Sequence, residues 1–157
     1  MNRKELEAYI LNQYSTEPDY PWADMPRAAV FRHASNRKWF ALVMEVPRDK
    51  LGLSGTAPLD VVNFKCDPIL IASLRGEAGI FPAYHMNKAS WITAALDGSV
   101  PRETLELLLD VSYEATKPKP RRNAMYDIDL LAARVAIRLS SCYNERIKRN
   151  REARSNG

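Results

Sequence analysis

The segment Lys38-Trp-Phe-Ala-Leu-Val-Met-Glu-Val46 has the composition of a strand and is apolar on nearly both faces. Successive side chains of a strand point to opposite faces, here Trp39, Ala41, Val43 and Glu45 on one side and Phe40, Leu42, Met44 and Val46 on the other. Apolar residues on both faces are typical of a strand inside a covered sheet. The segment therefore predicts an interior strand.

Further strand-like segments lie on both sides of it. Residues 28–33 precede it across the turn formed by residues 34–37, which predicts a hairpin. Residues 59–66, 80–84 and 91–96 are rich in Val, Ile, Phe and other strand-compatible residues, and predict three more strands.

Three helices are expected in the same part of the chain, over residues 3–14, 69–75 and 101–116. Asp67-Pro68 is a strong start signal for the second helix, because Asp caps free amides and Pro at the first helical position sacrifices no hydrogen bond. The order α-β-β-β-α-β-β-α predicts an α+β fold with two layers, an antiparallel sheet and the helices that cover it.

The composition is that of an ordinary globular chain, with 157 residues, 46% hydrophobic and 27% charged. No window approaches the roughly 18 apolar residues of a membrane helix, and no signal peptide is recognisable, so we expect a cytoplasmic protein. Cys66 and Cys142 lie far apart, and His33 and His85 are the only histidines, without metal-ligand spacing. We expect no disulfide framework, metal or cofactor.

The charges divide the chain into an acidic body and a basic end. Residues 1–116 carry a net charge of −3 and residues 117–157 a net charge of +7. The alternating prolines and basic residues of 117–126 predict a linker. Apolar residues then recur at helical spacing, so residues 127 to about 149 are expected to form an amphipathic helix within a third region, 127–157.

Two hypotheses for the basic end stay open. Its cations would bind the phosphates of DNA or another polyanion, through residues that include Arg121, Arg122, Arg134, Arg138, Lys148 and Arg149. Alternatively, the apolar stripe would bury against a second copy or a protein partner, through Ile128, Leu131, Val135, Leu139 and Cys142. A membrane partner is not expected, because the stripe has no Trp or Phe to anchor in lipid.

His85, Asn87, Lys88 and Trp91 form the densest polar and aromatic group, on the connection between two predicted strands. In a binding site, Lys88 would meet a phosphate or carboxylate, His85 and Asn87 would donate hydrogen bonds, and Trp91 would stack on a base. In a purely structural interpretation, Trp91 belongs to the core, and His85 and Asn87 satisfy the backbone of a turn.

The sequence favours a non-catalytic protein. Cys66 lies before a helix start, where a thiolate would be stabilised, yet a buried structural thiol is the commoner outcome. His33, at the end of a predicted strand, is expected at a turn or on the surface. An enzyme that uses His85 or Cys66 remains the weakest alternative.

Four motifs resemble the MmcQ/YjbR-like family, once described as a domain of unknown function: Lys38-Trp-Phe-Ala-Leu42, Asn63-Phe-Lys-Cys-Asp-Pro68, Pro82-Ala-Tyr-His-Met-Asn-Lys-Ala-Ser-Trp91 and Leu96-Asp-Gly-Ser-Val-Pro101. The resemblance implies a compact α+β fold with an antiparallel sheet, similar to secretion-chaperone-like and double-wing domains. Family members have been proposed to bind DNA from structural likeness, which is an analogy rather than a demonstrated role.

Two departures from the family pattern fall in the third motif. The family's usual Lys-x-His-Trp is Lys88-Ala-Ser90-Trp91 here, and its Pro-Gly-Tyr-His is Pro82-Ala-Tyr84-His85. If the second histidine of the family has a shared function, Ser90 removes it. The sequence as a whole predicts a non-catalytic binding protein that contacts DNA through the basic end and residues 85–91, with dimerisation or protein binding as the alternative.

Overall fold

The computed structural model describes residues 1–119 of the chain. The helices are α1 (Arg3–Tyr14), α2 (Pro68–Leu74) and α3 (Arg102–Thr116), with a short 3₁₀ helix, η1 (Arg48–Leu51). The strands are β1 (Ala29–Arg32), β2 (Trp39–Pro47), β3 (Pro58–Lys65), β4 (Ile80–Pro82) and β5 (Trp91–Ala95). The predicted α+β order of helices and strands is confirmed, whereas the predicted helix over 127–149 lies outside the described residues.

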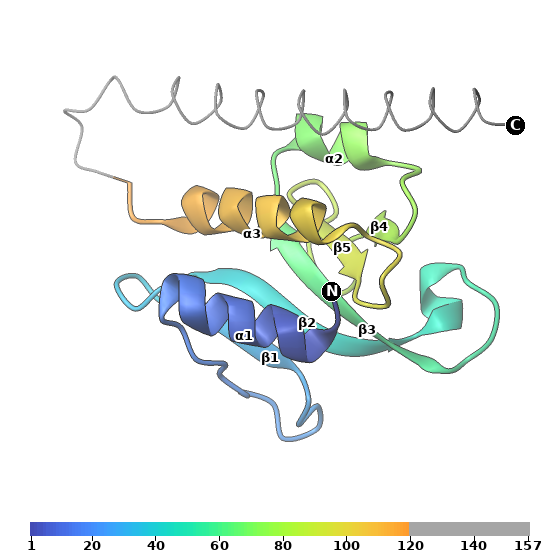
Figure 1. The fold of residues 1–157 in the computed structure, drawn as a ribbon, viewed down its shortest axis with the longest axis horizontal. Helices are drawn as coiled ribbons and strands as arrows, with labels where there is room; N and C mark the ends of the chain where they lie inside the picture. Colours follow the sequence, from blue (N-terminus) through green and yellow to red (C-terminus); the bar gives the residue numbers. More distant parts are fainter. Residues whose placement is uncertain (120–157) are drawn as a thin grey trace, which may run out of the picture. The chain divides into compact units, whose positions relative to one another are not determined.

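The five strands form one antiparallel sheet in the order β1-β2-β3-β5-β4 (Figure 1). β2 is an interior strand, as its two apolar faces predict, and β1 and β4 are the edges. The crossover that contains α2 places β4 outside β5, so the connection from β4 to β5 returns beside η1 at one end of the sheet.

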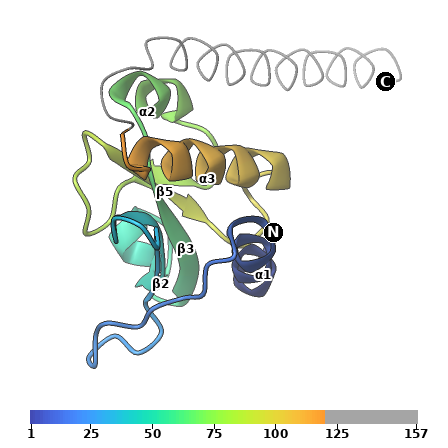
Figure 2. The same cartoon turned by 90° about the vertical axis from the view of Figure 1, so that its left-hand side faces the viewer.

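Helices cover one face of the sheet. α3 packs against β2 and β3, and the fully buried leucines of α3 share the interior with Phe31, Phe40 and Phe64. α1 adds Leu6 and Ile10, both 0% exposed. In Figure 2, α1 lies to the right of β2 and β3, whereas η1 lies to their left. The helices therefore leave the other face to the loops.

Loops and η1 cover that second face. The buried residues include Leu42, Met44 and Val61, and the partly buried side chains packed on this cluster are Trp22, Trp39, Leu51, Leu53, Phe81, Tyr84 and Met86. They come from four separate segments of the chain. This face is therefore bordered by exposed loop residues, and both hollows described below open among such residues.

A β-bulge changes the predicted facing of two side chains. The pairing of β1 with β2 shifts between Phe31 and Arg32, so Phe31 pairs with Ala41 whereas Arg32 pairs with Trp39. Trp39 consequently packs with Leu42 on the loop-covered face, while Phe40 contacts aromatic rings beside α1 and α3. The predicted alternation placed Trp39 and Phe40 the other way round, because an inserted residue breaks the period of two.

His33 lies at the hairpin turn, as one of its two predicted positions has it, but it is buried at 4% exposure, so the surface alternative is wrong. Its ring packs on Phe40 and Tyr113, with centroid distances of 5.2 and 4.3 Å. Nε2 must carry the proton, because it lies 3.0 Å from the carbonyl oxygen of Tyr113, which only accepts, and 2.8 Å from Oγ1 of Thr116. His33 of the hairpin thus donates a hydrogen bond to the last turn of α3, and its imidazole is buried by this contact.

Candidate functional site

A hollow of about 390 Å³ lies where η1 meets the connection from β4 to β5. Its lining residues are Lys50, Leu51, Phe81, Pro82, Ala83, Tyr84, His85 and Lys88. We call it the cationic hollow, because two lysines and a histidine line it and no acidic side chain does. The structure thereby brings His85 and Lys88 together, as the sequence predicts, and adds Lys50 from a distant segment.

The three basic side chains are exposed and have few partners. Lys88 forms no ion pair or hydrogen bond with any residue in the described part of the chain. Lys50 is 4.0 Å from the carboxylate of Asp49, a weak contact at the surface. His85 makes a ring contact with Tyr84, at a centroid distance of 4.2 Å and an interplanar angle of 65°. Their hydrogen-bond donors are therefore available to an anion.

A buried hydrogen-bond network fixes the backbone of Tyr84. The amide of Asn63 donates to the Tyr84 carbonyl oxygen at 3.2 Å, and the Tyr84 N–H donates to Oγ1 of Thr93 at 2.9 Å. The Thr93 hydroxyl donates in turn to Oδ1 of Asn63. Both side chains are 0% exposed and lie opposite each other on β3 and β5. The sheet interior therefore sets the position of Tyr84, which lines the hollow.

The next residue, His85, has a left-handed backbone with φ of 56°. This conformation is uncommon outside glycine and costs on the order of 1 kcal/mol or more, so the surrounding structure must hold it. The network on Tyr84 is the contact directly beside it. A rigid Tyr84 and a constrained His85 together give the cationic hollow a preformed wall.

Asn87 and Trp91 contribute differently from His85 and Lys88. The Asn87 side chain accepts the N–H of Ala89 at 2.9 Å, and the Asn87 carbonyl accepts the N–H of Ser90 at 3.1 Å, so Asn87 stabilises the turn. Trp91 is buried at 8% exposure, with the Lys65 ammonium 5.5 Å from its ring centroid. Neither residue lines the hollow, and Ser90, at the position of the family histidine, does not line it either.

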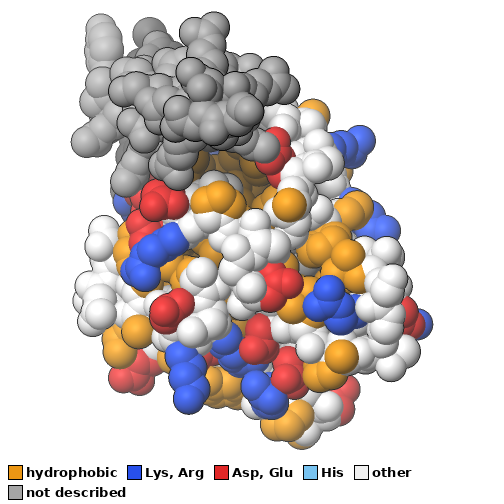
Figure 3. All heavy atoms as spheres, turned by 45° about the vertical axis from the view of Figure 1, so that its right-hand side comes forward, with side chains coloured by type: hydrophobic (Ala, Val, Ile, Leu, Met, Phe, Trp, Pro, Cys, Tyr) orange, Lys and Arg blue, Asp and Glu red, His pale blue; other side chains and the backbone are white. Residues whose placement is uncertain are grey.

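The predicted site residues of the basic end lie outside the described residues. They are Arg121, Arg122, Arg134, Arg138, Lys148 and Arg149 for nucleic acid, and Ile128, Leu131, Val135, Leu139 and Cys142 for a protein partner. On the face of the body shown in Figure 3, acidic and basic side chains are interspersed rather than gathered by sign. This face of the body therefore shows no patch of a single charge sign.

The catalytic alternative at Cys66 finds no support in its surroundings. Cys66 is 3% exposed, and burial, aided by Asp67, raises the pKa of its thiol to about 12. The thiol is therefore protonated at neutral pH, and the Asp67 side chain is engaged as the N-cap of α2. Among residues 1–119, no three His, Cys, Asp or Glu side chains gather to hold a metal ion.

Residues 11–115 match the family model described as YjbR. The chain belongs to the YjbR family. Protein YyaQ of Bacillus subtilis is 38% identical over 117 residues, which cover 74% of this chain and 99% of the relative. YjbR of Escherichia coli is 41% identical over 54 residues, 34% of this chain and 46% of that protein. Both relatives are named as uncharacterized proteins.

A crystal structure of a protein from Pseudomonas syringae has the same fold. It is 44% identical, superposes with a TM-score of 0.73, and covers 74% of this chain and 100% of its own. A solution structure from Pseudomonas syringae gives a TM-score of 0.70 at 41% identity, over 78% of this chain and 98% of its own. The predicted family and fold class are thus confirmed, while the comparisons leave the function of the YjbR family open.

Sequence reasoning missed Lys50 as a site residue and Asn63 and Thr93 as positioning residues. Lys50 follows β2 and has no local pattern that links it to residues 81–88. Asn63 and Thr93 did carry a signal, because each is a polar residue with apolar neighbours along its strand, and buried polar groups need hydrogen-bond partners.

Proposed function

We propose that this protein is a non-catalytic nucleic-acid-binding protein whose cationic hollow takes a backbone phosphate of a single strand. The observation that carries the proposal is the convergence of Lys50, His85 and Lys88 on a hollow with aromatic lining and no acidic side chain. Lysine and histidine side chains bind phosphate oxygens by charge and hydrogen bonds, without reading sequence.

Aromatic side chains support the choice of a single strand. Phe81 and Tyr84 are half-buried and line the hollow, so an unpaired base has rings to stack on beside the phosphate. Tyr84 takes the stacking role in this proposal, because the ring predicted for it, Trp91, is buried. A double helix keeps its bases paired and could not use these rings.

The basic end supplies most of the affinity in this proposal. Residues 117–157 carry a net charge of +7, against −3 for residues 1–116. Each cation that neutralises a phosphate releases a counterion, so affinity should fall steeply with salt. The proposal includes a cytoplasmic location, because two distant cysteines are typical of a reducing compartment. Within residues 1–119, no helix is both long and apolar enough to cross a membrane.

The test is the affinity of the full chain for a fluorescent single-stranded oligonucleotide at several salt concentrations. The variant Lys50→Glu/Lys88→Glu should flatten the plot of log affinity against log salt by about 1.4, since each lost contact to a single strand contributes about 0.7. Lys4→Glu/Arg75→Glu is the matched control, because both residues are exposed and lie outside the hollow. Arg121→Glu/Arg122→Glu should also weaken binding.

If the hollow variant and the control lost the same affinity for the oligonucleotide, the hollow would have no specific role in binding. Failure of the unmodified chain to bind at low salt would sink nucleic-acid binding altogether. The alternative, self-association through the stripe of residues 127–149, stays a prediction. Light scattering tests it, because Leu131→Asp/Val135→Asp should then convert a dimer into a monomer.

A further inference from the structure

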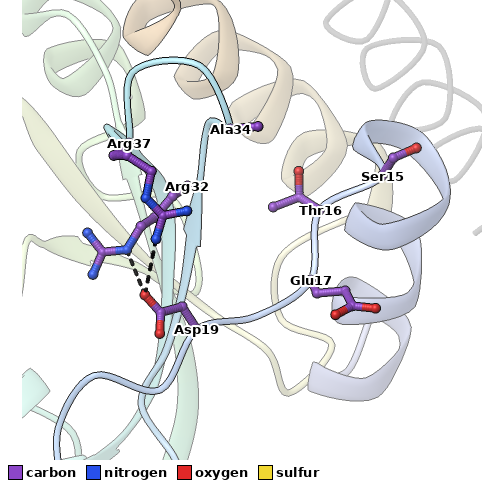
Figure 4. A pocket seen from close by; sticks show the side chains of 7 residues that line it. All are labelled: Ser15, Thr16, Glu17, Asp19, Arg32, Ala34 and Arg37. Carbon is purple, nitrogen blue, oxygen red and sulfur yellow. Dashed lines mark hydrogen bonds and ion pairs between the residues drawn. The ribbon is translucent and has the colours of Figure 1, made fainter.

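A second hollow, of about 190 Å³, lies where the segment after α1 faces the β1–β2 hairpin (Figure 4). Ser15, Thr16 and Glu17 line it on the side of α1, and Asp19, Arg32 and Arg37 line it on the side of the hairpin. We call it the amphoteric hollow, because its lining carries two acidic and two basic side chains. It shares no lining residue with the cationic hollow.

One arginine of the hairpin is fixed. Asp19 exchanges backbone hydrogen bonds of 2.9 and 2.8 Å with Val30, which holds its carboxylate beside β1. Nε of Arg32 donates to Oδ2 of Asp19 at 2.9 Å, and the same guanidinium lies 5.0 Å from the ring centroid of Trp39. Asp19 and Arg32 therefore balance each other as a preformed, partly buried pair.

The other arginine is held only loosely, by an ion pair with Asp19. Nη2 of Arg37 is 3.8 Å from the same oxygen of Asp19, which is too far for a hydrogen bond. Its guanidinium forms no hydrogen bond within residues 1–119, and the side chain is 69% exposed. The Arg37 backbone is left-handed, with φ of 59°, so the hairpin holds this residue in an uncommon conformation. Its planar donors match a carboxylate.

The side of α1 carries an acidic side chain, Glu17. Glu17 has no ion pair or hydrogen bond in the described part of the chain, and no ion pair joins it to Arg32 or Arg37. The Ser15 hydroxyl is also without a hydrogen bond there, while Thr16 donates to the Tyr14 carbonyl and keeps its lone pairs. Within residues 1–119, the hollow therefore has an unpaired carboxylate and hydroxyl oxygens on the side of α1, and on the side of the hairpin a guanidinium held by a loose ion pair with Asp19.

We propose that the amphoteric hollow binds a small zwitterion of the α-amino acid class. The ligand carboxylate pairs with Arg37 beside the fixed Arg32, and its ammonium pairs with Glu17 on the side of α1. A simple anion fits less well, because Glu17 and Asp19 oppose it. The volume lies below the roughly 300–1,000 Å³ of sites for drug-sized ligands, which favours a small side chain. This site is independent of nucleic-acid binding.

The test is an NMR titration of the ¹⁵N-labelled full chain with L-alanine. Saturable shifts should appear at the amides of residues 15–19 and 32–37, and those of residues 81–88 should stay unchanged. N-acetyl-L-alanine lacks the ammonium and ethylamine lacks the carboxylate, so each should bind at least about tenfold more weakly.

Two variants assign the charges. Glu17→Gln and Arg37→Gln should each weaken alanine binding about tenfold or more, whereas Lys38→Gln and Glu103→Gln, which alter exposed charges outside the hollow, should not. Equal binding of N-acetyl-L-alanine, or full binding by Glu17→Gln, would overturn the zwitterion. A dissociation constant above about 100 mM for alanine would overturn the site itself.

Discussion

The two hollows differ in what supports them. The cationic hollow rests on the buried network of Asn63 and Thr93, whereas the amphoteric hollow rests on the partly exposed carboxylate of Asp19. Among residues 1–119 there are three left-handed residues other than glycine, and all of them line a hollow: Ser15 and Arg37 the amphoteric one, His85 the cationic one.

The difference shows that a surface site can be stabilised by buried hydrogen bonds beneath it or by exposed ion pairs at its rim. Buried hydrogen bonds are little affected by salt and costly to lose, because the remaining partner stays desolvated. Exposed ion pairs contribute little and are screened by salt. Changes in the sheet interior should therefore disturb the cationic hollow, and changes in salt or surface charge should disturb the amphoteric hollow.

The largest effect is expected at Gly79, directly before the β4 wall of the cationic hollow. Its φ is 76°, and a Cβ would come within 2.7 Å of Cγ2 of Val100 and also collide with the Ser99 side chain. Gly79→Ala should lower the free energy of unfolding by about 3 kcal/mol, combining left-handed strain with overpacking.

Gly76→Ala is the matched control, because Gly76 has a φ of 86° with open space around its Cα. It should lose only about 1 kcal/mol, from backbone strain alone. Urea denaturation of both variants gives the comparison. Equal losses would show that close contact at Gly79 does not matter.

A smaller loss in the free energy of unfolding is expected for Thr93→Val. This change removes the acceptor of the Tyr84 N–H and the donor to Asn63, so unfolding should become easier by about 2 kcal/mol. NMR shifts should follow around residues 81–88 and not around 32–37. Thr93→Ser keeps the hydroxyl and should retain the shifts of the parent chain; if it moves them as much as Val does, the hydrogen bonds are not the cause.

Acid should act on the amphoteric hollow through His33, whose carbonyl accepts the N–H of Arg37 at 3.0 Å. Burial lowers the pKa of His33 below its usual 6.5, with a further lowering by Lys117. Unfolded His33 therefore binds protons that the folded form excludes, so the free energy of unfolding should fall as the pH drops below 6.5 towards the lowered pKa.

Urea denaturation at pH 8 and pH 5 measures this loss, and His33→Gln should show a smaller one. Amide signals of residues 33–37 should move over the same pH range before those of residues 81–85. An identical pH dependence of the variant and the parent chain would rule His33 out as the source.

The smallest effect on stability is expected for Asp19→Asn. The pairs with Arg32 and Arg37 lie at 19% and 69% side-chain exposure of the arginines, so the loss should be within about 1 kcal/mol and should shrink at high salt. Arg37 should become more mobile in NMR relaxation, while Tyr84 should not change. A loss that is independent of salt would contradict an exposed ion pair.

The sequence predicted the strands and helices because their patterns are local. β2 was recognisable from its two apolar faces, and α2 from Asp67-Pro68, whose carboxylate accepts the N–H groups of Ile69 and Leu70. The bulge at Trp39 and Phe40, opposite Arg32, was not recognisable, because it depends on how β1 pairs with β2. The burial of His33 was missed for a similar reason, since α3, which buries it, begins far along the chain.

Half of the candidate site at residues 85–91 was recognisable. His85 and Lys88 were found because loops concentrate binding side chains. Lys50 lies beside them only because the tertiary fold brings η1 to residues 81–88, and a local sequence pattern cannot predict this. Trp91 was expected either to stack on a base or to belong to the core, and its buried ring confirms the second interpretation.

Both edge strands of the sheet, β1 and β4, are poor partners for a further strand. β4 has only three residues and ends at Pro82, which has no N–H to offer a neighbour. At the other margin, Asp19 already bonds to both backbone groups of Val30. Another polypeptide therefore finds few free donors and acceptors in a row at either edge, which disfavours edge-to-edge pairing of the folded body.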